Sequence, residues 1–159
     1  MHRWLAVVVV VALSVSAIAQ GPPGGRGAAV GPVAGNGVEV PGWWARLDNP
    51  KEPRTGLRFV PMGAGFRATT GPTVILFDPN EDWEGPYTTK ATLTMTKLAS
   101  HQVAYGLFVG GQELDSDKQR YTYFEIRQDG KYLIRKRSGA SVTDVAGTWA
   151  DHAAIQKPN

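Results

Sequence analysis

The sequence predicts an all-β domain made of antiparallel strands in two packed sheets, a β-sandwich. Apolar and polar residues alternate with a period of two in several segments, most regularly in residues 119–128, as expected for strands with one buried face. Asp129-Gly130 separates this segment from another alternating one, residues 131–137, and this dipeptide is typical of a β-hairpin turn. No segment after residue 19 keeps a helical period over about a dozen residues. These observations favour a sandwich of short strands over a helical fold.

The first 42 residues are predicted to lie outside this domain. Residues 1–19 resemble a secretory signal peptide, with a basic start, an apolar run and Ala17-Ile18-Ala19 before the cleavage point. The apolar run is shorter than the roughly 18 residues that span a bilayer, so cleavage is expected and membrane insertion is not. Residues 20–42 are rich in glycine, proline and alanine, which is the composition of a flexible linker. Residues 43–159 are then enough for one domain.

The composition narrows the location and the partners. An export signal places the protein in the periplasm or outside the cell. The chain has no cysteine and therefore no disulfide framework. Its formal net charge is only +3, and cleavage of the signal removes Arg3. Such a weak positive excess, together with export, argues against nucleic acid as a partner.

Three short strands are predicted in the N-terminal half of the domain, in addition to its start. The domain is expected to begin at Trp43-Trp44, whose side chains point to opposite faces if they lie in a strand. Short strands are predicted at residues 57–60 and 65–69, separated by a turn. The dense apolar run at residues 73–77 predicts a fully buried strand.

Three further strands are predicted in the C-terminal half. In residues 87–97, one face carries Tyr87 and every second residue to Met95, and the other face is rich in threonine. Residues 103–109 continue the alternation. In residues 119–128 the sequence predicts that the face with Thr122, Phe124 and Ile126 is dry, and that the opposite face is open to a ligand.

The ordered segments GFRATTGPTVILFDP, GPYTTKATLTMTK, AYGLFVGG and RYTYFEIRQDGKYLIRKRSG resemble a known family. They are similar to the concanavalin A-like lectin/glucanase jelly rolls, and within these to bacterial exported domains of the laminin-G-like or 3-keto-disaccharide hydrolase type. The resemblance covers roughly residues 63–155. It implies a jelly-roll sandwich and a carbohydrate or cell-envelope glycan as ligand.

Two departures from the family pattern bear on function. The glucanase motif E-x-D-x-x-E has no counterpart here, which argues against glucanase activity. Related domains continue past a segment like Trp149 to Ile155 into further strands, whereas this sequence ends at Asn159. The sandwich is therefore expected to be incomplete at its C-terminal end, with an open sheet edge that a protein partner could fill.

One candidate ligand site lies in the polar loop after residue 77. Trp83 is surrounded by acidic and amide side chains, which is the composition of a platform for stacking a sugar ring, although the indole could instead fold back over the domain. Asp78 and Asn80 belong to a series of oxygen-bearing residues at every second position. That spacing suits Ca²⁺, but a solvated acidic loop is the more common outcome, and no other cofactor is expected.

A second candidate site lies on the predicted strand at residues 119–128. Tyr121 and Tyr123 could form another sugar platform if their face is concave. Glu125 shares that face, and the ordinary interpretation of this residue is an ion pair across the hairpin with Arg135 or Arg137. Glycosidases require a pair of carboxyl groups, and no second carboxylate accompanies Glu125 in the predicted strands.

Three functions remain open at this point. The first is an exported carbohydrate-binding module without a recognisable catalytic site, because the sequence shows no serine nucleophile motif and too few histidines for zinc. The second is a glycoside hydrolase or an enzyme that cleaves 3-keto-glycosides, with Glu125 or a loop aspartate as acid or base. The third is a structural module completed by a strand from a partner.

Overall fold

The computed structural model describes residues 37–81 and 84–157, which form an all-β protein with antiparallel strand pairing throughout its three sheets. The signal peptide, most of the linker and Trp83 lie outside the described residues. No helix in the described part has the length and apolar character needed to cross a membrane. The strands are β1 Trp44–Leu47, β2 Arg58–Met62, β3 Gly65–Thr69, β4 Val74–Phe77, β5 Ala104–Gln112, β6 Arg120–Arg127, β7 Lys131–Ser138, β8 Ser141–Asp144 and β9 Ala150–Asp151.

The large sheet has the order β5-β6-β7-β8, and β9 pairs with the same strand as β8, which is β7. The predicted hairpin joins β6 to β7, and Ile126 is paired with Tyr132. Its turn is closed by a hydrogen bond from the Gly130 amide to the Arg127 carbonyl at 3.0 Å. Among the turn residues 128–130, only Gly130 takes a positive φ, of 86°. The connection is therefore a three-residue loop with glycine at the left-handed position, and not a two-residue turn.

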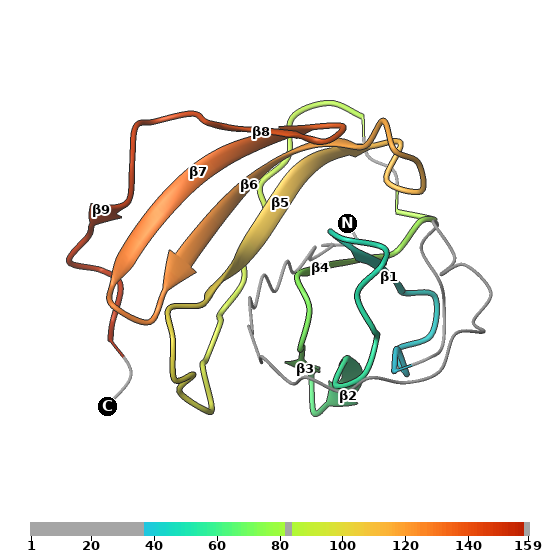
Figure 1. Ribbon diagram of the computed structural model, residues 1–159, viewed down its shortest axis with the longest axis horizontal. Helices are drawn as coiled ribbons and strands as arrows, with labels where there is room; N and C mark the ends of the chain where they lie inside the picture. Colours follow the sequence, from blue (N-terminus) through green and yellow to red (C-terminus); the bar gives the residue numbers. More distant parts are fainter. Residues whose placement is uncertain (1–36, 82–83, 158–159) are drawn as a thin grey trace.

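Strands β1 and β4 form a separate ribbon that the large sheet covers (Figure 1). All four residues of β4 are buried, because consecutive side chains of a strand point to opposite faces and both faces of this ribbon are covered. Val74 and Leu76 pack with Phe59 of β2 in one cluster. Ile75 and Phe77 pack instead with a second cluster on the large sheet, which contains Phe108, Tyr121 and Tyr123.

Trp44, the first residue of β1, and Trp43, which precedes it, pack against different clusters. Trp43 lies against Phe59, with ring centroids 5.1 Å apart, and Trp44 lies 6.4 Å from Phe77. The packed core also begins earlier than expected. Val38 and Val40, from the segment predicted to be linker, are buried with Phe59, so among the described residues the packed core includes positions before residue 43.

The prediction of which face of β6 is dry is wrong. Tyr123 and Glu125 are buried, whereas Phe124 is 41 % exposed and Ile126 is only half-buried. We call the face with Tyr121, Tyr123 and Glu125 the inner face, because it is the one directed at the β1/β4 ribbon. The physical reason is that packing of the ribbon, and not side-chain hydrophobicity alone, decides which face of the sheet becomes the interior.

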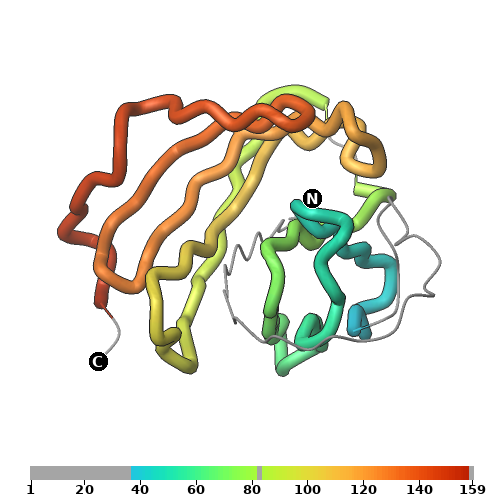
Figure 2. The backbone as a smooth tube through the Cα atoms, in the orientation of Figure 1, coloured from blue at the N-terminus to red at the C-terminus, as the bar shows by residue number. Residues whose placement is uncertain are grey.

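The predicted strand at residues 87–97 is also wrong as a member of a sheet. The segment follows the β5 side of the large sheet (Figure 2) but has no ladder pairing. One contact that attaches it is the hydrogen bond from the Gly110 amide to the Tyr87 hydroxyl, at 3.0 Å. The expected alternation does exist, because Thr89, Ala91, Leu93 and Met95 are half-buried and the intervening residues are exposed. The periodicity thus correctly indicated an extended chain, but it did not indicate whether a neighbouring strand forms hydrogen bonds with it.

Candidate functional site

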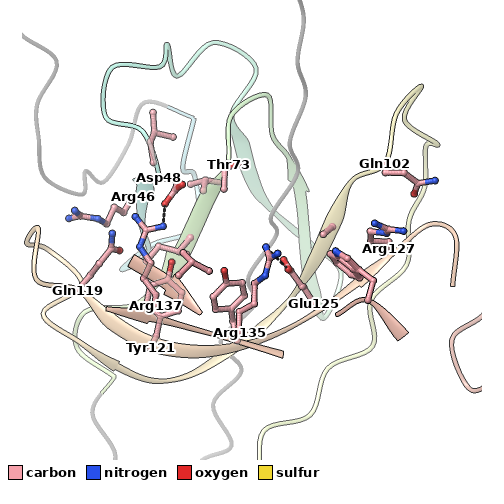
Figure 3. Close-up of a pocket in the computed structure, with 17 residues that line it drawn as sticks. Arg46, Asp48, Thr73, Gln102, Gln119, Tyr121, Glu125, Arg127, Arg135 and Arg137 are labelled. Carbon is pink, nitrogen blue, oxygen red and sulfur yellow. Dashed lines mark ion pairs between the residues drawn. The ribbon is translucent and has the colours of Figure 1, made fainter. Parts of the chain in front are cut away.

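A cavity of about 360 Å³ lies between the inner face of the large sheet and the β1/β4 ribbon (Figure 3). Its lining on β6 consists of alternate residues, since these share one face of the strand. The register brings β7 residues beside them, pairing Tyr123 with Arg135 and Tyr121 with Arg137. The β6 side of the lining is Gln119, which precedes the strand, and Tyr121, Tyr123, Glu125 and Arg127.

Glu125 is the most deeply buried acidic group of the cavity, with 2 % of the side chain exposed. Its Oε1 lies 3.3 Å from Arg135 Nη1, but the geometry is not that of a hydrogen bond, and Oε1 has no hydrogen-bond partner in the described part of the chain. Arg135 is held more closely by Asp144, with Nε donating to Oδ1 at 2.8 Å. Burial raises the pKa of Glu125 above its ordinary value, and the positive charge of Arg135 only partly opposes this. The predicted cross-strand ion pair with Arg135 is confirmed.

The two tyrosines pack against each other and against β5. Their ring centroids are 5.4 Å apart, and the Tyr121 ring lies 5.3 Å from that of Phe108. Burial raises the pKa of Tyr121 to about 12, and burial also raises the pKa of Tyr123. Both hydroxyls are therefore neutral at physiological pH and can each donate and accept a hydrogen bond.

The two ends of the cavity carry further arginines, as Figure 3 shows for Arg127 and Arg137. Arg137 Nη1 pairs with Asp48 Oδ1 at 2.6 Å, and its Nε donates to the Gly139 carbonyl at 2.6 Å. At the other end Arg127 pairs with Asp129. The Arg127 guanidinium carbon lies 4.3 Å from the centre of the Trp149 ring, a distance at which a cation–π contact is favourable.

The sequence-predicted residues separate into two groups. Tyr121, Tyr123, Glu125 and Arg135 all line the cavity. Asp78 and Asn80 do not; they form a turn after β4, in which Asp78 Oδ1 accepts hydrogen bonds from the Asn80 amide and side-chain nitrogen at 2.9 and 3.1 Å. Trp83 lies outside the described residues.

No cluster of three or more histidine, cysteine or carboxylate side chains suited to a metal occurs within residues 37–81 and 84–157. The oxygen-bearing loop residues that suggested Ca²⁺ include Asp82, which lies outside the described residues. The possible Ca²⁺ site therefore stays a prediction.

Several residues of the cavity lining were not predicted as site residues, and Gln102, Gln119 and Arg46 are examples. Gln102 and Gln119 lie just before β5 and β6, and an extension of the alternation by one step would have placed them on the inner face. Arg46 lies on β1, two residues after Trp44 and on the same face of that strand. No local signal indicated that this face of β1 would meet the large sheet.

Comparisons of the chain with protein-family models, with curated proteins and with solved structures found no match. The fold and the cavity thus define the protein at the level of an all-β structure with antiparallel sheets and an arginine- and tyrosine-lined cavity.

Proposed function

We propose that the protein is an exported module that binds a carbohydrate or cell-envelope glycan in this cavity. The observation that carries the proposal is the convergence of Tyr121, Tyr123, Glu125 and Arg135 on one cavity that Trp149 also lines. Hydroxyl, carboxyl and guanidinium groups supply donors and acceptors for the many hydroxyls of a sugar, and aromatic side chains supply apolar surface.

The size of the cavity limits the ligand. A volume of about 360 Å³ lies near the lower end of the ~300–1,000 Å³ range of small-molecule sites. A small saccharide or the end of a glycan chain suits this volume better than the interior of a polymer. The cavity is also closed on one side by the β1/β4 ribbon, whose Val74 and Ile75 contribute to its lining together with Thr73, which precedes β4.

The concanavalin A-like jelly roll is the finer fold that we propose with this function, and the periplasm or the exterior of the cell is the location. The order of the similar segments and the layered packing of β4 against the large sheet support the fold. The signal-like residues 1–19 support the location.

A glycan array followed by isothermal titration calorimetry tests the proposal. Trp149→Ala should weaken binding of the selected glycan about tenfold or more, because it removes an aromatic side chain from the cavity lining. Tyr132→Leu is the matched control: Tyr132 stacks on the outer-face Phe124 at 5.8 Å, so its replacement should leave binding unchanged. The absence of any glycan ligand, or equal effects of the two substitutions, would refute the proposal.

Trp83→Ala belongs in the same series. The sequence predicts that this ring stacks on a sugar, and an affinity equal to that of the wild type would remove Trp83 from the site.

One observation favours a second candidate, cleavage of a glycosidic bond. Glu125 is a buried carboxyl with a raised pKa inside the cavity, and a raised pKa is what a general acid requires. Asp48 is the other carboxylate of the lining and would have to act as base or nucleophile. Release of sugar from glycosides and 3-keto-glycosides should then disappear in Glu125→Gln. Activity retained by this variant would exclude Glu125 as the acid.

A further inference from the structure

Arg46 is a cation of the cavity that forms no ion pair with an acidic group of the described residues. It lies on β1 and lines the cavity, and only 9 % of the residue is exposed. Figure 3 shows it at the same end of the cavity as Gln119, beside the Arg137–Asp48 ion pair. Its Nη1 donates to the Leu114 carbonyl at 3.2 Å. Its buried Nε has no acceptor among the described residues.

The other three arginines of the lining differ from Arg46 in this respect. Each has a carboxylate within ion-pair distance: Asp129 for Arg127, Asp144 for Arg135 and Asp48 for Arg137. No carboxylate within residues 37–81 and 84–157 forms an ion pair with Arg46. Neutralisation by a partner is thus the rule in this cavity, and Arg46 is the exception.

A buried charge without a partner is unfavourable, and so is a buried N–H without an acceptor. A guanidinium carries its positive charge throughout the physiological pH range. An anion that enters the cavity and accepts a hydrogen bond from Nε would remove both penalties. The neutral Tyr121 hydroxyl, which also lines the cavity, would not oppose such an anion.

We propose that the Arg46 end of the cavity binds the carboxylate of an acidic saccharide, a hexuronic acid. This inference rests on the proposed glycan-binding function and names the class of glycan. One guanidinium without a partner matches one negative charge, and a planar carboxylate suits the geometry of guanidinium donors. A phosphate monoester carries about −1.5 to −2 charges at pH 7. The cavity already contains the carboxyl groups of Asp48 and Glu125, so a singly charged carboxylate is favoured over a phosphate.

Calorimetric titration of the wild-type protein with glucuronic acid, its methyl ester and glucose provides the test, repeated with galacturonic acid and its counterparts. The acid and its ester share one ring and differ in charge. A charge-assisted hydrogen bond contributes about 1.5–3 kcal/mol, so we expect at least one of the acids to bind about ten- to a hundredfold more tightly than its ester. Arg46→Gln should reduce the affinity for that acid to about the level of the ester.

Arg58→Gln is the matched control. Arg58 is an exposed arginine of β2 that pairs with Glu39 at 3.3 Å, so this variant should keep the preference of the wild type for the acid. A preference that persists in Arg46→Gln would overturn the inference.

The comparison of acid and ester binding to the wild-type protein tests the inference even if Arg46→Gln does not fold, because it needs no substitution. Equal binding of acids and esters, or binding of neutral glycans alone, would overturn the inference and leave the proposed function intact. Absence of binding to every acidic and neutral saccharide would refute both.

Discussion

Ile75→Ala tests whether the β1/β4 ribbon packs under the large sheet, on which the cavity depends. Ile75 is 5 % exposed and belongs to the cluster that joins β4 to Phe108, Tyr121 and Tyr123. Its neighbour Leu76 is fully buried but belongs to the other cluster, with Phe59. Two adjacent residues of one strand thus face two different interiors, which an ordinary strand of a half-exposed sheet does not show.

The expected cost of the substitution follows from the buried carbon atoms. Replacing isoleucine by alanine removes three carbons, and each buried methylene contributes about 0.8 kcal/mol. The transfer term is therefore about 2.4 kcal/mol, and the cavity that remains raises the total toward the ~2–5 kcal/mol seen for such replacements. We expect Ile75→Ala to lower the free energy of unfolding by about 3 kcal/mol and Leu76→Ala to lower it by a similar amount.

Urea denaturation followed by tryptophan fluorescence measures these differences, with an unchanged m-value as the sign that cooperativity is preserved. Val109→Ala on β5 is the control, because Val109 is 39 % exposed and its replacement should cost less than about 1 kcal/mol. The double variant Ile75→Ala/Leu76→Ala should be close to additive, since the two side chains belong to different clusters. A cost for Ile75→Ala no larger than that of the control would refute the packing, and the cavity would lose its ribbon wall.

Two further predictions concern the large sheet. Burial raises the pKa of Glu125 above 4.5, so the native protein holds this proton more tightly than the unfolded chain, and the free energy of unfolding should fall as pH rises from 4.5 through the raised pKa. Glu125→Gln should show a smaller fall in urea titrations at pH 4 to 8, and identical pH dependence in both proteins would contradict the assignment. A Cβ at Gly106 would lie 1.8 Å from the Phe124 carbonyl oxygen and 2.8 Å from the Glu125 Cα, so Gly106→Ala should cost about 3 kcal/mol by forcing β5 and β6 apart. Gly65→Ala, whose nearest neighbour lies at 3.9 Å, should cost less than about 1 kcal/mol, and equal thermal stability of the two variants would refute the steric argument.

Local patterns predicted several of the strands and the hairpin, although the expected strand at residues 87–97 has no ladder pairing. The alternation in residues 119–128 and 131–137 corresponds to β6 and β7, and the apolar run at residues 73–77 corresponds to the buried β4. Both signals are local, because a strand with its two faces in different surroundings needs a period of two and a strand covered on both faces needs a continuous apolar run. Gly130 at the turn is local as well, since a left-handed φ favours glycine.

Part of the candidate site could be predicted for the same reason. Tyr121, Tyr123 and Glu125 share a face by periodicity alone, and the hairpin brings Arg135 opposite Tyr123. Arg46 could not be predicted to join them, because it comes from β1, a strand of another sheet. Its position depends on how two sheets pack, and no residue near Arg46 in the chain encodes that contact.

The sequence by itself determined the extended chain, the turns and the sorting of side chains into two faces, because these follow from the geometry of a few neighbouring residues. Only the tertiary structure decided which face of β6 lies inside, and it placed Phe124 outside and Glu125 inside. The physical reason is that the burial of a side chain depends on how all the sheets pack together. A tyrosine or a paired glutamate can be buried when a second layer covers it, and the layer that packs against Tyr121 and Tyr123 comes from β4.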